Sequence, residues 1–147
     1  MNKIYFAASI RAGRDDIHLY HQLIEHLSNY GKVLSEHIGN KDLSQLGDDG
    51  STNDIHNKDM SWLNESSHIV AEVTTASLGV GYELGRIVER NIWVSPSLNK
   101  KILCLYRPQI NRRLSAMIAG CDGIMNVEYQ NLDEAKKAID NFFKPKS

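Results

Sequence analysis

The chain has 147 residues, 41% hydrophobic and 24% charged, which is the composition of a globular protein with enough chain for one domain, residues 1–147. Its 17 Lys and Arg residues nearly balance its 18 Asp and Glu residues, and a net charge of -1 offers no basic field to hold a nucleic acid polymer. The most apolar stretches, at 69–73 and 102–106, are far below the roughly 18 residues of a membrane helix, and a strand pattern follows the N-terminus directly, so we expect neither a membrane span nor a secretion signal.

Short runs of Ile, Val and Leu alternate along the chain with segments whose apolar residues recur every three or four positions. The first pattern is typical of buried strands and the second of amphipathic helices. In chain order we predict strand 3–8, helix 16–29, strand 33–37, helix 54–66, strand 68–73, helix 81–90, strand 101–106, helix 113–119, strand 123–127 and helix 132–143. Strands separated by helical crossovers pair in parallel. The predicted fold class is α/β, a Rossmann-like (flavodoxin-like), doubly wound sheet of five parallel strands sandwiched by helices.

Two segments interrupt this alternation. Residues 39–52 are rich in Gly, Asp, Asn and Ser where a helix would normally follow the second strand, and a loop of this length is often functional. Residues 91–99 contain Trp93 and Pro96, and we interpret them as a surface insertion. We expect Trp93 to be partly exposed and packed on its own loop, with a subunit contact or a pocket wall as the alternatives.

Ligands of open α/β sheets bind outside the carboxyl ends of the strands, so the loops at those ends hold the first candidate residues. The loop after the first predicted strand, residues 9–14, reads SIRAGR. Its small residues let the backbone approach a ligand, and its two guanidinium groups suit a phosphate. A single phosphate is the predicted ligand, and solvated loop charges are the alternative interpretation.

The loop after the third predicted strand brings glycines to the start of a helix, where residues 77–85 read SLGVGYELG. The spacing G-x-G-x-x-x-G differs from the G-x-G-x-x-G of dinucleotide-binding proteins, and it follows the third strand instead of the first. It also places Glu83 in the first helical turn, where the carboxylate would repel a pyrophosphate. Exposed amides and the Ser77 hydroxyl still suit a monophosphate.

Glu83 interrupts the apolar stripe of this predicted helix. Val80 precedes it by three positions and Ile87 follows it by four, so its carboxylate faces the interior. An acid in the first turn also stabilises the helix dipole, by typically ~0.3–1 kcal/mol, but an outward side chain would do so equally well. We therefore interpret Glu83 as a functional carboxylate.

Asp59 repeats the argument on the preceding helix. Ile55 lies four positions before it and Trp62 three after it, so a second acid interrupts an apolar face. Burying an unpaired charge is costly, and Asp59 must be paired, protonated or open to a ligand. The polar residues 56–58 could supply a partner. Two inward carboxylates on either side of the third strand instead suggest the nucleophile and the acid of glycosidic bond cleavage.

Other reactive side chains carry less weight. His18, His21 and His26 spread too widely around one helix to bind a single metal ion, and we interpret them as surface histidines. Cys104 and Cys121 form neither a metal-binding spacing nor a disulfide framework, so a reducing cytoplasmic or nuclear compartment is expected. Neither a G-x-S-x-G elbow nor a Walker motif occurs, which argues against serine hydrolase and P-loop chemistry.

Several segments together resemble the 2'-deoxynucleoside 5'-monophosphate N-glycosidase (N-hydrolase) family, which is related to the nucleoside 2-deoxyribosyltransferases. The segments that carry the resemblance are YFAASIR (5–11), DMSWL (59–63), AEVT (71–74), SLGVGYELGR (77–86), ILCLYRP (102–108) and LSAM (114–117). The resemblance extends from about residue 3 to residue 143, and the combination of SLGVGYELGR with LSAM is specific.

The resemblance implies a homodimer that hydrolyses a small-molecule deoxynucleoside monophosphate to a free base and 2-deoxyribose 5-phosphate, with no cofactor and no metal. Glu83 matches the family nucleophile, Asp59 the second carboxylate, and Tyr5 the tyrosine that lies against the sugar. Contacts to phosphate or sugar match Ser9, Arg11, Ser77 and Gly79, and Ser115 matches a serine supplied by the neighbouring subunit. With Ile10 and Gly13 of the first loop, these are the predicted substrate-binding residues.

Two departures from the family pattern concern base preference and loop closure. Ala8 stands where a glycine is common, and the 91–99 segment is longer than expected. Two alternative functions stay open. In a deoxyribosyltransferase a second base, instead of water, would attack the adduct on Glu83, although an enzyme for unphosphorylated nucleosides has no need of a phosphate site. A non-catalytic nucleotide-binding module would gain nothing from carboxylates beside an anion.

Overall fold

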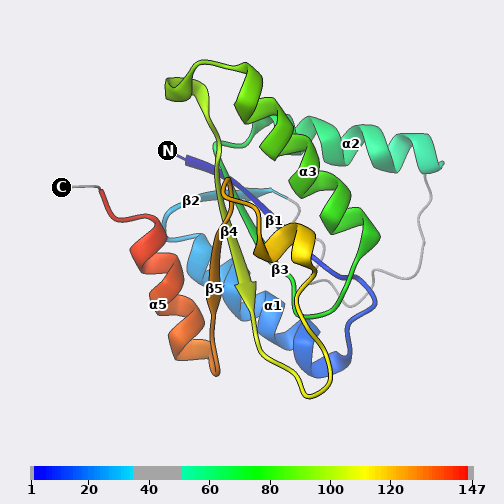
Figure 1. Cartoon of the computed structure of the whole chain (residues 1–147), viewed down its shortest axis with the longest axis vertical. Helices are drawn as coiled ribbons and strands as arrows, with labels where there is room; N and C mark the ends of the chain where they lie inside the picture. The colour runs from blue at the N-terminus through cyan, green and yellow to red at the C-terminus, as the bar shows by residue number, and fades with distance from the viewer. Residues whose placement is uncertain (1, 35–50, 146–147) are drawn as a thin grey trace.

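The computed structural model describes residues 2–34 and 51–145 and arranges them around a parallel sheet (Figure 1). The strands are β1 (Asn2–Ala8), β2 (Gly31–Leu34), β3 (His68–Glu72), β4 (Lys101–Tyr106) and β5 (Met125–Glu128). They lie in the order β2-β1-β3-β4-β5, and each neighbouring pair runs parallel. The predicted α/β fold with five parallel strands is confirmed.

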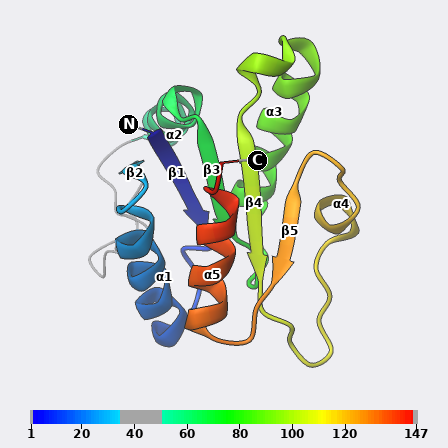
Figure 2. The ribbon, with the colours of Figure 1, turned by 90° about the vertical axis from the view of Figure 1, so that its left-hand side faces the viewer.

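Helices cover both faces of this sheet. They are α1 (Arg14–Leu27), α2 (Thr52–Glu65), α3 (Leu78–Trp93), α4 (Ala116–Ala119) and α5 (Leu132–Phe142). α1 and α5 lie side by side on one face and bury Phe6 and Val70 (Figure 2). α2 and α3 cover the other face, over Tyr5 and Ala71. Because successive side chains of a strand point to opposite faces, neighbouring residues of one strand serve two separate cores.

The chain leaves two adjacent strands, β1 and β3, toward opposite faces of the sheet. β1 continues into α1 on one face, and β3 continues into α3 on the other (Figure 1). At such a point the loops diverge beyond the carboxyl ends of the strands and leave a crevice for a ligand. Residues 9–13 and 73–77 are the two loops that border this crevice.

Serine side chains cap the first turns of α2, α3 and α4. Ser51 accepts a hydrogen bond from the backbone N–H of Asp54 at 3.1 Å, and Ser77 accepts one from Val80 at 3.2 Å. Ser115 caps α4 in the same way. These bonds satisfy N–H groups that have no partner within a helix. Ser77 and Ser115, which the sequence predicts as phosphate contacts, therefore also fix where their helices begin.

Several predicted bounds are wrong. α1 begins at Arg14, two residues before the predicted start, and the last strand covers Met125–Glu128 instead of 123–127. The second strand begins two residues earlier than predicted, at Gly31. Residues 35–37 of that predicted strand and 39–50 of the predicted loop lie outside the described residues.

The helix predicted over 113–119 is also wrong, because only Ala116–Ala119 is helical. The preceding residues form a turn, in which Asn111 has a left-handed backbone with φ 63° and a bridge joins Gln109 to Arg112. The Ser115 cap then sets the helix start. An apolar pattern alone could not reveal this turn.

The segment 91–99 is only partly the surface insertion that we predict from the sequence. α3 extends through Trp93, and Pro96–Leu98 form a short 3-10 helix, η3. Asn91 closes the segment, since its side chain bonds both the backbone N–H of Lys100 at 2.9 Å and its carbonyl at 2.8 Å. Trp93 is 78% exposed, and its indole N–H donates to Glu89 one turn earlier. The tryptophan therefore lies along its own helix.

Candidate active site

A cavity of about 580 Å³ lies at the crevice beyond the carboxyl ends of the strands. Its walls come from β1 with the loop that follows it, from α2, and from residues 76–83 at the start of α3. The three residues predicted to act in catalysis, Tyr5, Asp59 and Glu83, all line it. The structure thus brings together side chains from three separate elements.

Tyr5 and Glu83 meet directly in this cavity. Tyr5 projects from β1 toward the α2/α3 layer, and its hydroxyl donates a hydrogen bond to the Glu83 carboxylate in the first turns of α3. The inward orientation predicted for Glu83 from the apolar stripe is therefore correct, because Val80, Leu84 and Ile87 on the same side of α3 are buried. The bond fixes the carboxylate above the sheet.

Burial raises the pKa of Glu83 to about 7. The hydrogen bond from Tyr5 opposes this shift, and the nearby charge of Asp59 adds to it. The pKa of the Tyr5 hydroxyl is also raised, first by burial and then by the charge of Glu83, so the phenol keeps its proton. Near neutral pH the cavity therefore holds a carboxyl group that titrates beside a permanent hydroxyl donor, a combination typical of catalytic sites.

Asp59 lies on α2, on the side of the cavity opposite α3. Leu63, one turn later, is completely buried, whereas Ile55, one turn earlier, is 46% exposed. The prediction that Ile55 lies on the packed face is wrong, since the buried residues of α2 are Met60 and Leu63 in its second half. Asp59 itself is half-buried and opens into the cavity.

The predicted phosphate-binding residues gather at the other end of the cavity. Ser9, Ile10 and Arg11 line it from the loop after β1, and Ser77 and Gly79 line it from the start of α3. The Ser9 hydroxyl is almost fully buried and accepts a hydrogen bond from the Arg11 N–H at 3.2 Å. Backbone amides at the start of α3 and the Arg11 guanidinium together make this end suitable for an anion.

Two predicted binding residues lie outside the cavity. Gly13 is the N-cap residue of α1 and is exposed. Ser115 lines a second cavity of about 710 Å³, between α3 and α4, together with Leu78 and Met117. Leu78 is 96% exposed and Met117 is 85% exposed. Ser115 therefore does not reach the first cavity of its own chain.

Two further residues line the cavity that the sequence did not single out for binding. His56 of α2 and Tyr82 of α3 face each other across its rim, with His56 Nε2 2.9 Å from the Tyr82 hydroxyl. Arg86 donates to the same hydroxyl at 2.7 Å. His56 precedes Asp59 by three positions and so lies on the same face of α2. The three-residue spacing between His56 and Asp59 is therefore the feature of the sequence that indicates that His56 lines the cavity.

A third residue that the sequence analysis passed over is Glu72, the last residue of β3. It is a carboxylate that is 1% exposed, within a strand that we predict from its apolar residues.

Within residues 2–34 and 51–145, no three His, Cys, Asp or Glu side chains form a group that could hold a metal ion. None of the described helices is both long and apolar enough to cross a membrane.

Comparison with known proteins adds independent evidence. Residues 4–107 match the family of nucleoside 2-deoxyribosyltransferases. A protein of Tetraodon nigroviridis named 5-hydroxymethyl-dUMP N-hydrolase is 44% identical over 145 residues, which are 96% of each chain. A protein of Trichoplax adhaerens named putative 2'-deoxynucleoside 5'-phosphate N-hydrolase 1 is 46% identical over 95% of this chain and 92% of its own. The solved structure of a Clostridium botulinum CMP N-glycosidase shares the fold, with a TM-score of 0.66 at 16% identity over 96% of this chain and 99% of its own.

Proposed function

Because this chain belongs to the nucleoside 2-deoxyribosyltransferase family, we propose that it is an N-glycosidase that hydrolyses 2'-deoxynucleoside 5'-monophosphates to a free base and 2-deoxyribose 5-phosphate. One observation carries the proposal. The cavity holds the Tyr5–Glu83 hydrogen bond and Asp59 at one end and an anion-binding set of residues at the other. A nucleotide offers a scissile bond and a phosphate in this same relation.

Glu83 is the proposed nucleophile. Its carboxylate attacks C1' of the deoxyribose as the bond from C1' to the base nitrogen breaks, and the electrons of that bond pass to the base. In the reacting complex the carboxyl pair holds one proton, and Asp59 donates it to the departing base. A water molecule then attacks C1' of the ester, gives a proton to Asp59, and releases Glu83 as a carboxylate. Each carboxyl group ends in its starting state.

Tyr5 supports both steps without changing its own protonation. Its hydroxyl donates to one oxygen of Glu83, which orients the carboxylate and leaves the other oxygen for the sugar. The transition state has oxocarbenium character, and a 2-deoxy sugar lacks the hydroxyl that would oppose this positive charge. A carboxylate pair is therefore sufficient machinery for the reaction.

The 5'-phosphate is the proposed occupant of the opposite end. Arg11 supplies a guanidinium there, Ser9 and Ser77 supply hydroxyls, and the amides around Gly79 begin α3. Charge-assisted bonds of this kind are the strongest available to a protein. They would fix C1' relative to Glu83, which contributes to the rate as well as to affinity.

The substrate site is proposed to be completed by a second copy of the chain. Ser115 lies on the wall of the second cavity, which shares residues 76–78 with the first. Leu78 and Met117 expose large apolar side chains along that wall, as is typical of a surface that pairs with another protein. In a homodimer the partner would bring its own Ser115 to the phosphate end.

A cytoplasmic or nuclear location stays a prediction from the cysteine content.

Base release from a panel of nucleotides tests this function. We expect the purified chain to liberate base and an equal amount of 2-deoxyribose 5-phosphate, and 5-hydroxymethyl-dUMP is the first substrate to try because relatives carry its name. dUMP, dGMP and their nucleosides complete the panel. A parallel reaction with added free adenine detects transfer. Failure to release base from every nucleotide overturns the proposal, and formation of dAMP from a nucleotide, or of deoxyadenosine from a nucleoside, identifies a transferase instead.

A further inference from the structure

Glu72 occupies a central position at the carboxyl edge of the sheet. It is the last residue of β3, where it pairs with Ala8 of β1 on one side and with Leu105 of β4 on the other. Its side chain lies on the α1/α5 face, as does that of Val70 two positions earlier. Tyr5 and Glu83 lie on the opposite face. Glu72 therefore takes no direct part in the proposed reaction.

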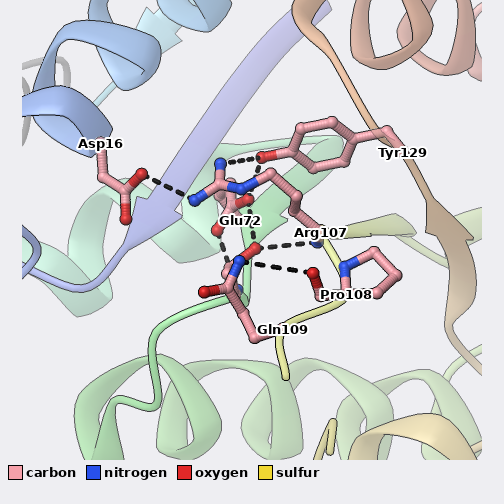
Figure 3. A network of polar contacts seen from close by, with 7 residues as sticks. Asp16, Glu72, Arg107, Pro108, Gln109 and Tyr129 are labelled. Atoms are coloured by element: carbon pink, nitrogen blue, oxygen red, sulfur yellow. Dashed lines mark hydrogen bonds and ion pairs between the residues drawn. The ribbon is translucent and has the colours of Figure 1, made fainter. Parts of the chain in front are cut away.

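The Glu72 carboxylate accepts three hydrogen bonds (Figure 3). One oxygen accepts from the backbone N–H of Thr74 at 2.8 Å. The other accepts from the Thr74 hydroxyl at 2.7 Å and from the hydroxyl of Tyr129, which follows β5. The residue is 1% exposed. Through these bonds, Glu72 connects the start of the 73–77 loop to the end of β5.

A second set of contacts continues from this carboxylate to α1. Arg107, just after β4, donates to the Tyr129 hydroxyl at 3.2 Å and to the carboxylate of Asp16 at 2.8 Å (Figure 3). The backbone N–H of Arg107 also donates to the Thr74 hydroxyl at 2.9 Å. Asp16 lies in the first turn of α1, directly after the 9–13 loop. The network therefore connects the flanks of both loops that border the crevice.

This arrangement is a costly way to hold a sheet together. Burial raises the pKa of Glu72, and the bonds from Tyr129 and Thr74 only partly offset that shift. An apolar residue at the end of a buried strand usually stabilises a fold as well as a buried, fully bonded charge does. Stability alone therefore gives little reason for a carboxylate at this position, whereas fixing two loops relative to each other requires directional bonds.

We propose that Glu72 is a positioning residue that, through Thr74 on one side and Tyr129, Arg107 and Asp16 on the other, holds the 9–13 and 73–77 loops at the spacing that a 5'-phosphate requires. The inference rests on the proposed function, since those loops carry Ser9, Arg11 and Ser77. It assigns the affinity for the phosphate, but not bond cleavage, to a network on the far face of the sheet.

The variant Tyr129→Phe tests this role, because it removes one hydroxyl that both donates to Glu72 and accepts from Arg107. We expect KM for a deoxynucleoside monophosphate to rise about tenfold with kcat within about twofold of wild type. KM for the matching deoxynucleoside, which lacks the phosphate, should not change. Tyr20→Phe is the matched control, since this buried hydroxyl has no hydrogen-bond partner among the described residues.

The outcomes separate cleanly. An equal rise in KM for nucleotide and nucleoside, no rise for either, or the same effect from Tyr20→Phe overturns the positioning role. Asp16→Ala removes the acceptor for Arg107 and cuts only the link to the 9–13 loop, and it replaces Tyr129→Phe in the same comparison if circular dichroism shows that the latter is unfolded. If wild-type protein releases no base from any nucleotide, the proposed function fails. If wild type is active and the variants keep its preference for the nucleotide, only the inference about Glu72 fails.

Discussion

Tyr5 and Glu83 are 78 positions apart in the sequence, and the hydroxyl of the first donates to the carboxylate of the second inside the cavity. The two residues belong to β1 and α3, so the bond forms only when the β1–β3 edge of the sheet is complete. This hydrogen bond also lowers the pKa of the Glu83 carboxyl group, whereas burial raises that pKa. This contact therefore orients the proposed nucleophile and favours its ionised form.

Glu83→Gln should abolish turnover while substrate binding survives. The amide has the shape of the carboxylate and can still accept the bond from Tyr5, but it cannot form the glycosyl ester. We expect kcat to fall by about 10³-fold or more, measured as base release, with nucleotide binding retained in titration calorimetry. Near-normal base release would make Asp59 the next candidate for the nucleophile.

Glu83→Gln should also raise the free energy of unfolding at neutral and higher pH. Folding raises the pKa of Glu83 from 4.5 to about 7, so its contribution to stability is present below the unfolded value and is lost as pH rises through about 7. Between pH 4 and pH 8 the variant should gain on the order of 3 kcal/mol in free energy of unfolding relative to wild type. Urea titrations at the two pH values measure this difference, and a difference independent of pH contradicts it.

The rate constant kcat/KM should fall as pH rises through about 7, because the carboxyl pair must hold the one proton that Asp59 donates, and Glu83 loses the last proton of the pair there. Tyr5→Phe removes a hydrogen bond to the ionised form of Glu83 and should shift this limb to higher pH. Rates of base release between pH 5 and 9 locate the limb in wild type and variant. A limb that stays in place, or that moves to lower pH, would refute the assigned cause.

Arg11→Ala should reduce the preference for nucleotides over nucleosides. Loss of a charge-assisted contact to phosphate costs ~1.5–3 kcal/mol, or roughly 10- to 150-fold in kcat/KM for the monophosphate. The deoxynucleoside should be a poor substrate for wild type and variant alike, and a ribonucleotide should be poorer than its deoxy counterpart if Tyr5 lies against the sugar as proposed. Equal wild-type rates on nucleotide and nucleoside would instead favour a transferase.

A mixture of two impaired variants tests the shared site. Ser115→Ala should weaken phosphate binding in the cavity of the partner chain. Glu83→Gln should inactivate the cavity of the chain that carries it. In a mixed dimer one cavity then has both native residues, so activity should recover toward about one quarter of wild type on random pairing. Sedimentation should give twice the 16.6 kDa of one chain. A fully active monomer, or a mixture without recovery, contradicts the homodimer.

Local patterns predicted most of the fold and the carboxylate pair, and failed where tertiary contacts decide. The apolar stripe around Glu83 places that acid on an interior face because helical periodicity is a local property, whereas the stripe around Asp59 is only partly correct, since Ile55 is exposed. The start of α3 was predicted three residues late, at Gly81, since the Ser77 cap was interpreted as part of a ligand loop. Tyr5 carries no periodic signal that separates it from the other apolar residues of its strand, and only the family resemblance singled it out.

Glu72 shows the limit most clearly. Its hydroxyl partner Tyr129 lies 57 positions away, and no spacing rule connects residues at that distance. The His56–Tyr82 contact spans 26 positions and likewise forms only after α2 and α3 pack on the sheet. A single acid within an apolar strand is nevertheless a local anomaly, and buried carboxylates require partners. The sequence therefore indicates that Glu72 has hydrogen-bond partners, but it does not identify them.

The rim of the cavity is built from side chains that the core does not use. His56 and Tyr82 are exposed, and the residues that anchor α2 and α3 to the sheet lie on the other sides of those helices. Exposed positions of this kind tolerate substitution with little loss of stability. Libraries restricted to these two positions should therefore change which nucleobase is accepted, and a single scaffold could be diversified toward modified or damaged bases without rebuilding its reaction centre.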